Sequence, residues 1–291
     1  MSPRRITFSI AVIVLLSAVP VVGDETSEPA KIDQFMRLAR SEEGDVTALQ
    51  TSVVRYQRPT ETGTVVDLIG AIHIAEKEYY EQINERFDDY DVVLYELVAP
   101  EDAAAPLPGQ RSAHPVTAIQ VGMKDLLGLR FQLDCVDYRK PNLKRADLTT
   151  QEMTESMTRR GESLLQVFFR MMGQGIAAQS KDPTRSSDSR LLAAFFAKDR
   201  ATQLKRVMAE ELERNMAMPS VLDGPDGSTI VTVRNRRAMD ELEKQIRAGK
   251  KRIAIFYGAA HLPEMADQLK QRFGLLPTRT TWLLAWKIES E

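Results

Sequence analysis

The sequence predicts an α/β fold in which two βαβ-type halves form a central, mostly parallel sheet flanked by helices, with a helical insert between the halves. Three observations predict it. Apolar, β-branched runs alternate with segments whose apolar residues have helical spacing. The phrase Gly-x-x-His follows two of those runs, at Gly70–His73 and at Gly258–His261. Residues 149–220, between the two phrases, are helical in character.

The first half spans residues 46–148 and predicts a βαβ unit. Runs at 46–57 and 64–73 are rich in β-branched residues, as strands are. Apolar residues at helical spacing follow in 74–90, and "DVVLYELV" at 91–98 predicts a buried strand, which should be parallel to the one before the helix. A helix is expected over 116–129 and a strand over 130–140. Residues 24–45 predict a polar leader with a short helix over 32–42.

The insert and the second half follow. Thr149 and Glu152 have the spacing of a capping box at the start of the insert. Seven of the 12 methionines fall in the insert, which predicts either adaptable core packing or a soft groove for an apolar or peptide ligand. Residues 221–291 predict a helix over 230–249, a strand over 251–261, a helix over 262–274 and a last strand over 279–288. The second half thus repeats the first.

The N-terminus predicts export. Residues 1–23 combine a basic start, an apolar run and small residues, which is typical of a signal peptide. The chain is then expected in the periplasm or outside the cell, with the membrane as a partner only if this segment stays uncleaved as an anchor. The formal net charge is −2, and loss of Arg4 and Arg5 with the signal makes the chain more acidic, which argues against nucleic acid as a partner. With one cysteine, Cys135, no internal disulfide is expected.

Gly-x-x-His at a strand end predicts a functional site. Ligands of parallel sheets bind beyond the carboxyl ends of the strands. Glycine there lets a ligand or another chain segment come close, and the following helix start attracts negative charge. His73 and His261 should both emerge at this edge, and so should Glu96, which ends "DVVLYE". A carboxylate there is costly to bury without a partner.

Two histidines and a glutamate suit a divalent transition metal ion such as Mn, Co, Zn or Fe. Without a metal, the same three residues could act as base, acid and orienting group in a hydrolysis. Arg234, which opens "RNRRAMDEL", is a further candidate as an anion clamp beside Asn235, or it simply starts a helix. A purely structural role is the alternative for each of the other three residues. His73 and His261 would then be hydrogen-bonded residues at strand ends, and Glu96 would be a salt-bridge partner.

At these residues the chain resembles the TraB/PrgY/GumN group, which includes the Tiki proteases, and more distantly the erythromycin-esterase and ChaN-like superfamily. The resemblance rests on "GAIHIA", "VVLYEL", the "RN" of "VTVRNRRAMDEL" and "GAAHLPEM". It implies a metal-dependent hydrolase, most simply a peptidase, with His73, Glu96 and His261 as site residues and Arg234 beside them. Many relatives have Gly where this chain has Glu264. The chain also lacks the C-terminal membrane helices of several members, which favours the GumN-like branch.

Three functions are therefore expected from different classes. The first is an exported metal-dependent hydrolase acting on a peptide or another acyl substrate. The second is a non-catalytic protein that binds a peptide signal, haem or iron, although the sequence offers no evident axial-ligand arrangement for haem. The third is a metal-free esterase in which a histidine is the general base.

Overall fold

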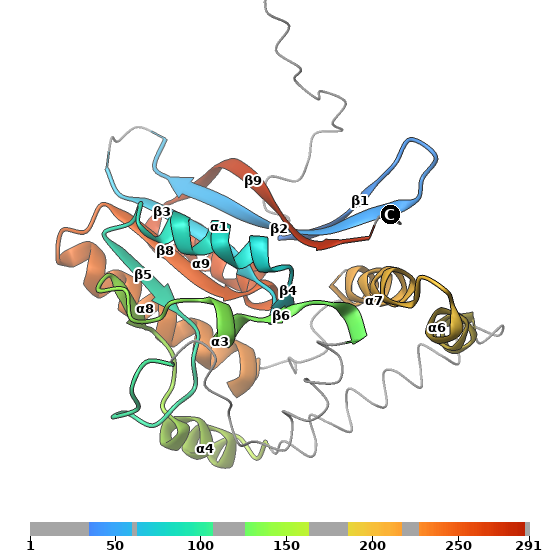
Figure 1. Cartoon of the computed structure of the whole chain (residues 1–291). Helices are drawn as coiled ribbons and strands as arrows, with labels where there is room; N and C mark the ends of the chain where they lie inside the picture. The colour runs from blue at the N-terminus through green and yellow to red at the C-terminus, as the bar shows by residue number, and fades with distance from the viewer. Residues whose placement is uncertain (1–34, 60–62, 107–125, 163–185, 217–226, 289–291) are drawn as a thin grey trace, which may run out of the picture. The chain divides into compact units, whose positions relative to one another are not determined.

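A mixed sheet of seven strands forms the centre of the protein (Figure 1). The computed structural model describes residues 35–59, 63–106, 126–162, 186–216 and 227–288. The seven strands are β1 (Met36–Arg40), β2 (Val46–Gln57), β3 (Val65–Ala71), β5 (Val92–Tyr95), β7 (Leu143–Arg145), β8 (Arg252–Gly258) and β9 (Leu276–Lys287). A two-stranded sheet pairs β4 (Ile74–Ala75) with β6 (Arg130–Phe131).

The sheet order combines strands of the two predicted halves. It runs β1-β2-β3-β8-β5-β7, with β9 paired to β2. The strands β3, β8, β5 and β7 are mutually parallel, whereas β2 is antiparallel to β1, β3 and β9. The predicted α/β class is thus confirmed. The strand β8 of the second half lies between β3 and β5 of the first, so the halves interleave in one sheet.

Helices cover both faces of the parallel part of the sheet, because its strands are apolar on both sides. They are α1 (Lys77–Phe87), α8 (Arg234–Arg247) and α9 (Leu262–Phe273). The core on one face contains Ile69, Val93 and Phe256 together with Tyr79, Tyr80, Ile83 and Phe87 of α1. The core on the other face contains Leu68, Leu94 and Ile255 together with Ala238, Met239 and Leu242 of α8 and Leu262, Met265 and Leu269 of α9.

The register brings the two Gly-x-x-His phrases together. In the parallel pair of β3 and β8, Gly70 lies opposite Tyr257 and Ala71 opposite Gly258. Both phrases therefore end adjacent strands at the same edge of the sheet. At Gly70 a Cβ atom would lie 3.3 Å from the carbonyl oxygen of Phe35, where the chain entering β1 passes. The glycine permits this close approach.

Two local predictions are wrong. The helix expected over 32–42 is replaced by β1, because the extended chain gains an antiparallel partner in β2. The strand expected over 130–140 is only the short β6, followed by the single turn α3 (Gln132–Cys135). The helix expected over 230–249 is present, as a π-helix, η1 (Thr229–Val233), that continues into α8. Tertiary contacts override local propensity in the two wrong cases.

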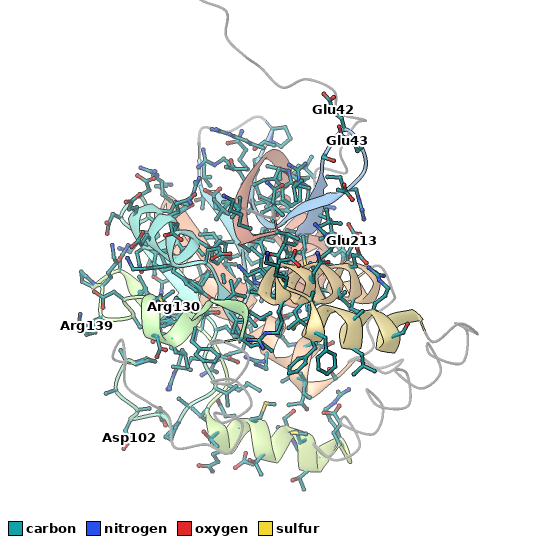
Figure 2. The ribbon with its side chains drawn as sticks, turned by 45° about the vertical axis from the view of Figure 1, so that its right-hand side comes forward. Glu42, Glu43, Asp102, Arg130, Arg139 and Glu213 are labelled. Carbon is teal, nitrogen blue, oxygen red and sulfur yellow. The ribbon has the colours of Figure 1, made fainter. Side chains whose placement is uncertain are left out.

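The described part of the insert is helical. It contains α4 (Thr150–Arg159), α6 (Ser186–Phe196) and α7 (Arg200–Met216). Glu213 of α7, labelled in Figure 2, accepts a hydrogen bond from the backbone N–H of Leu38 in β1 at 3.2 Å. Met157 is buried and Met208 packs against the core, as expected for core packing. In the parts of the chain described, no helix is long and apolar enough to cross a membrane.

Two predictions concern segments outside the described residues. These are the signal peptide over residues 1–23 and most of the helix expected over 116–129. They stay predictions.

The predicted capping box at the start of α4 is present. The Thr149 hydroxyl accepts from the Glu152 N–H at 3.0 Å, and the Glu152 carboxylate accepts from the Thr149 N–H at 2.8 Å. We expect Thr149→Ala to lower the free energy of unfolding by about 1 kcal/mol, whereas Thr149→Ser keeps the acceptor and stays near wild type. Urea denaturation measures both. Equal losses in the two variants would contradict a stabilising role for this hydroxyl.

Candidate functional site

Four strand-end residues form a cluster at the carboxyl edge of the parallel strands. Glu96 follows β5, Gly258 ends β8, and His261 lies in the short 3-10 turn η2 (Ala259–His261) that leads into α9. Glu96 Oε2 accepts from the Gly258 N–H at 2.7 Å, and a Cβ atom on Gly258 would lie 3.2 Å from that oxygen. Glycine at 258 therefore lets the Glu96 carboxylate reach the backbone. Asp147, two residues beyond β7, completes the cluster.

Arg234 links the two carboxylates. Its Nη2 atom donates to Glu96 Oε1 at 2.7 Å and to Asp147 Oδ2 at 2.6 Å, while its Nε donates to Asp147 Oδ1 at 2.9 Å. All three side chains are largely buried. A buried guanidinium shared by two carboxylates satisfies charges that would each be costly alone. Arg234 thus ties α8 to the ends of β5 and β7.

Two buried polar residues begin α8, directly after the π-helix η1. Arg234 is 9% exposed and Asn235 is 0% exposed. The Ser228 hydroxyl caps η1 by accepting from the Val231 N–H at 3.1 Å. Thr229 Oγ1 lies 2.9 Å from Ser156 Oγ of α4. Single π-helical turns often occur at functional sites.

Asn235 holds His261. Its Oδ1 atom lies 2.7 Å from His261 Nδ1, and its Nδ2 donates to the His261 carbonyl oxygen at 3.2 Å and to Glu264 Oε2 at 2.9 Å. The other ring nitrogen, Nε2, lies 3.6 Å from Glu96 Oε1. The Tyr257 ring packs edge-on against the imidazole, with 5.4 Å between ring centroids.

The cluster keeps Glu96 ionised. Burial raises the pKa of this carboxyl, but the charges of His261 and Arg234, the Gly258 N–H and the charge of His73 together lower the pKa to about 2. Burial lowers the pKa of His261, and although Glu96 opposes this, the net pKa is below the usual value. The site near neutral pH therefore combines an ionised glutamate with a neutral, buried histidine.

His73 lies at the same edge but is exposed. Its Nδ1 atom is 3.1 Å from Gln132 Oε1, and Gln132 Nε2 donates to the Tyr138 hydroxyl at 2.8 Å. The Gln132 backbone N–H also donates to the His73 carbonyl oxygen at 2.9 Å. With the amide oxygen facing Nδ1, that nitrogen carries the proton and Nε2 keeps its lone pair. Gln132 therefore fixes the ring of His73 from the buried side.

The expected metal ligands are only partly assembled. Two ligands of one tetrahedral ion, each about 2.1 Å from it, lie roughly 3.4 Å apart, which is close to the 3.6 Å between His261 Nε2 and Glu96 Oε1. However, Arg234 already donates to that same oxygen. Among the described side chains, no group of three or more His, Cys, Asp or Glu is placed to hold a metal ion. As placed, these residues do not make the expected three-ligand site.

A cavity elsewhere does not coincide with the cluster. Its volume is about 90 Å³, and it lies toward the opposite end of the parallel strands, near the start of β3. It is lined by Val53, Arg55, Asp67, Arg86, Arg279 and Thr281. Arg55 and Asp67 satisfy each other there through two hydrogen bonds of 2.9 Å, so this polar cavity is explained by a structural ion pair.

The structure therefore brings Arg234 and His261 each into contact with Glu96, with His73 at the same sheet edge. Sequence reasoning missed Asp147, Gln132 and Tyr138. Asp147 follows a strand end just as Glu96 does, but β7 is only three residues long and carries no clear strand signal. Gln132 and Tyr138 fall in the segment wrongly predicted to be a strand, so neither the contact of Gln132 with His73 nor that of Tyr138 with Gln132 had a signal.

Comparison of the chain with protein families, curated proteins and solved structures finds no match. The resemblance to the TraB/PrgY/GumN group therefore rests on the motif residues alone.

The low pKa of Glu96 makes stability depend on pH. The pKa of about 2 lies below the value of 4.5 for an unperturbed glutamate. Ionised Glu96 hence contributes its full stabilisation above about pH 4.5 and loses it as the pH falls toward 2, by about 3 kcal/mol in all. We expect Glu96→Gln to remove this part of the pH dependence of the unfolding free energy, measured with chelator present. An exposed glutamate of α1, replaced in Glu85→Gln, serves as control. Parallel pH profiles for wild type and Glu96→Gln would contradict the assignment.

Proposed function

We propose that the chain is an exported hydrolase of peptide or other acyl bonds, with His73, Glu96, His261 and Arg234 as its active site. One observation carries the proposal: an exposed histidine with an oriented ring lies at the same strand edge as a buried, ionised carboxylate. Fixed charges and oriented bases are what acyl hydrolysis requires. The N-terminal segment over residues 1–23 would deliver the chain, and the membrane would be a partner only if that segment is retained.

In this proposal His73 is the general base. Hydrogen bonding of Nδ1 to Gln132 leaves the Nε2 lone pair to accept a proton from a water molecule that attacks the substrate carbonyl. The imidazolium formed can then return the proton to the leaving amine or alcohol. The hydrogen bond that the His73 ring donates to Gln132 and the one that the Gln132 N–H donates to the His73 backbone keep the base oriented throughout.

The buried cluster supplies the electrostatic support. The charge of His73 is among the causes that lower the pKa of Glu96, so the two side chains interact electrostatically. Arg234 stays charged, because hydrogen bonds and charges from Asp147 and Glu96 outweigh the effect of burial on its pKa. It holds Glu96 in place, so the carboxylate does not need to reorganise during the reaction.

A metal-dependent form of the same reaction is the second candidate. The distance of 3.6 Å between two acceptor atoms, His261 Nε2 and Glu96 Oε1, favours a cation between them. Bound Mn, Co, Zn or Fe would polarise the carbonyl and lower the pKa of a bound water molecule. His73, Glu96 and His261 would be its ligands. For this, His73 would have to approach the pair and Arg234 would have to share Glu96.

The test measures hydrolysis of a fluorogenic peptide library and of aryl esters by the purified chain. We expect His73→Gln to lower kcat/KM by roughly 100-fold or more, because general-base catalysis contributes about that much. His114→Gln, which replaces the remaining histidine, is the matched control and should retain activity. Wild-type activity in His73→Gln would contradict the proposal, and ligand capture without turnover would favour the binding-protein alternative.

The same assay distinguishes the metal-free reaction from the metal-dependent one. Removal of metal by a chelator, followed by addition of Mn, Co, Zn or Fe, is expected to leave the rate unchanged if the metal-free reaction is correct. Loss and recovery of the rate would instead establish the metal-dependent form. Metal content measured on wild type and His261→Ala gives a readout that needs no substrate.

A further inference from the structure

The Asn235 side chain makes contacts that leave only one orientation of its amide group. Nδ2 faces the His261 carbonyl oxygen at 3.2 Å and Glu264 Oε2 at 2.9 Å. Both of these partners only accept hydrogen bonds, so the NH2 group must point toward them. The amide oxygen then faces His261 Nδ1 at 2.7 Å. In a fully buried side chain, the reversed amide would place oxygen against two acceptors.

This orientation decides the tautomer of His261. The Asn235 oxygen can only accept, so His261 Nδ1 must carry the proton that it receives. In the neutral ring, Nε2 then keeps a lone pair, and this lone pair faces Glu96 Oε1 across 3.6 Å. The opposite tautomer would carry its proton on Nε2 and could donate it to Glu96. His261 and Glu96 could then no longer accept a proton from another group or bind a cation between them.

Among Glu264, Asn235 and His261, which these hydrogen bonds connect, Glu264 is the charged residue. It lies in the first turn of α9, three residues after His261, and its second oxygen, Oε1, accepts from Gln268 Nε2 at 3.3 Å. Hydrogen bonds to ionised groups are stronger than neutral ones, so Glu264 weighs more than the His261 carbonyl oxygen in orienting Asn235. No sequence motif used above assigns a role to it.

We propose that Glu264 is a positioning residue that, through Asn235, fixes His261 in the tautomer with the proton on Nδ1 and the lone pair of Nε2 open toward Glu96. This refines the proposed hydrolase site, and its importance for turnover rests on that proposed function. Glu264 itself contacts neither ring nitrogen of His261 in this arrangement. The tautomer, however, is a property of the folded chain that can be measured without a substrate.

The test is NMR of the chain labelled with nitrogen-15 histidine, recorded at about pH 8, where free histidine is neutral. The chain has only three histidines, so spectra of His73→Gln and His114→Gln assign the signals of His261. We expect Nδ1 of His261 to give the shift of a protonated ring nitrogen and Nε2 that of an unprotonated one. A wild-type His261 protonated on Nε2 would overturn the proposal.

Two variants of Glu264 separate its hydrogen bond from its bulk. Glu264→Ala removes the acceptor and should shift the tautomer ratio of His261 by roughly tenfold toward Nε2–H, since one charge-assisted hydrogen bond is lost. Glu264→Gln keeps a carbonyl oxygen for Asn235 but not the charge, and should shift the ratio less than Glu264→Ala does. An unchanged ratio in Glu264→Ala, in a sample whose thermal melt shows a folded chain, would overturn the proposal.

The rate of hydrolysis is an independent readout. If the hydrolase is found, kcat should fall in Glu264→Ala and fall less in Glu264→Gln. Should no hydrolysis be found, the tautomer result still stands or falls by itself, so failure of the function and failure of this inference are distinguishable.

Discussion

The arrangement of the site depends on one buried cation, the guanidinium of Arg234. It donates to carboxylates that follow two different strands, Glu96 after β5 and Asp147 after β7. Burial of two neighbouring carboxylates without a cation between them would be costly. Because α8 begins at Arg234, the same contact fixes the helix against the sheet and places Asn235 beside His261. The electrostatics and the geometry of the cluster therefore have a common origin.

The two histidines of the repeated motif are held in the same way but in different surroundings. Each has an amide oxygen at Nδ1, from Gln132 for His73 and from Asn235 for His261. His73 is exposed, whereas His261 is 6% exposed and faces Glu96. Burial lowers the pKa of His261 and keeps it neutral. An oriented, exposed base backed by a buried acceptor pair is the arrangement from which the proposed hydrolysis follows.

Much of this edge of the sheet could be predicted from sequence. Strands β3, β5 and β8 are long or strongly apolar, and the rule that parallel strands share a carboxyl edge placed His73, Glu96 and His261 on the same side. The elements that were predicted wrongly or missed are short and depend on a neighbouring strand of the sheet. The strand β1 needs β2, and the three residues of β7 have no signal without β5. Asp147 and Gln132 were consequently missed. Amide orientation at Asn235 follows from Glu264 and cannot be read from spacing.

The most direct test of the central claim is a double-mutant cycle between Arg234 and Asp147, measured as free energies of unfolding for Arg234→Met, Asp147→Leu and the double variant. Arg234→Met leaves two buried carboxylates without their cation, but only Glu96 when Asp147 is already replaced, so the double variant should cost about 2 kcal/mol less than the two singles added together. Arg237 and Glu152, an exposed pair 3.6 Å apart that includes a residue of α8, form the control cycle and should show coupling of about 1 kcal/mol or less. Additive effects at Arg234 and Asp147 would contradict the account.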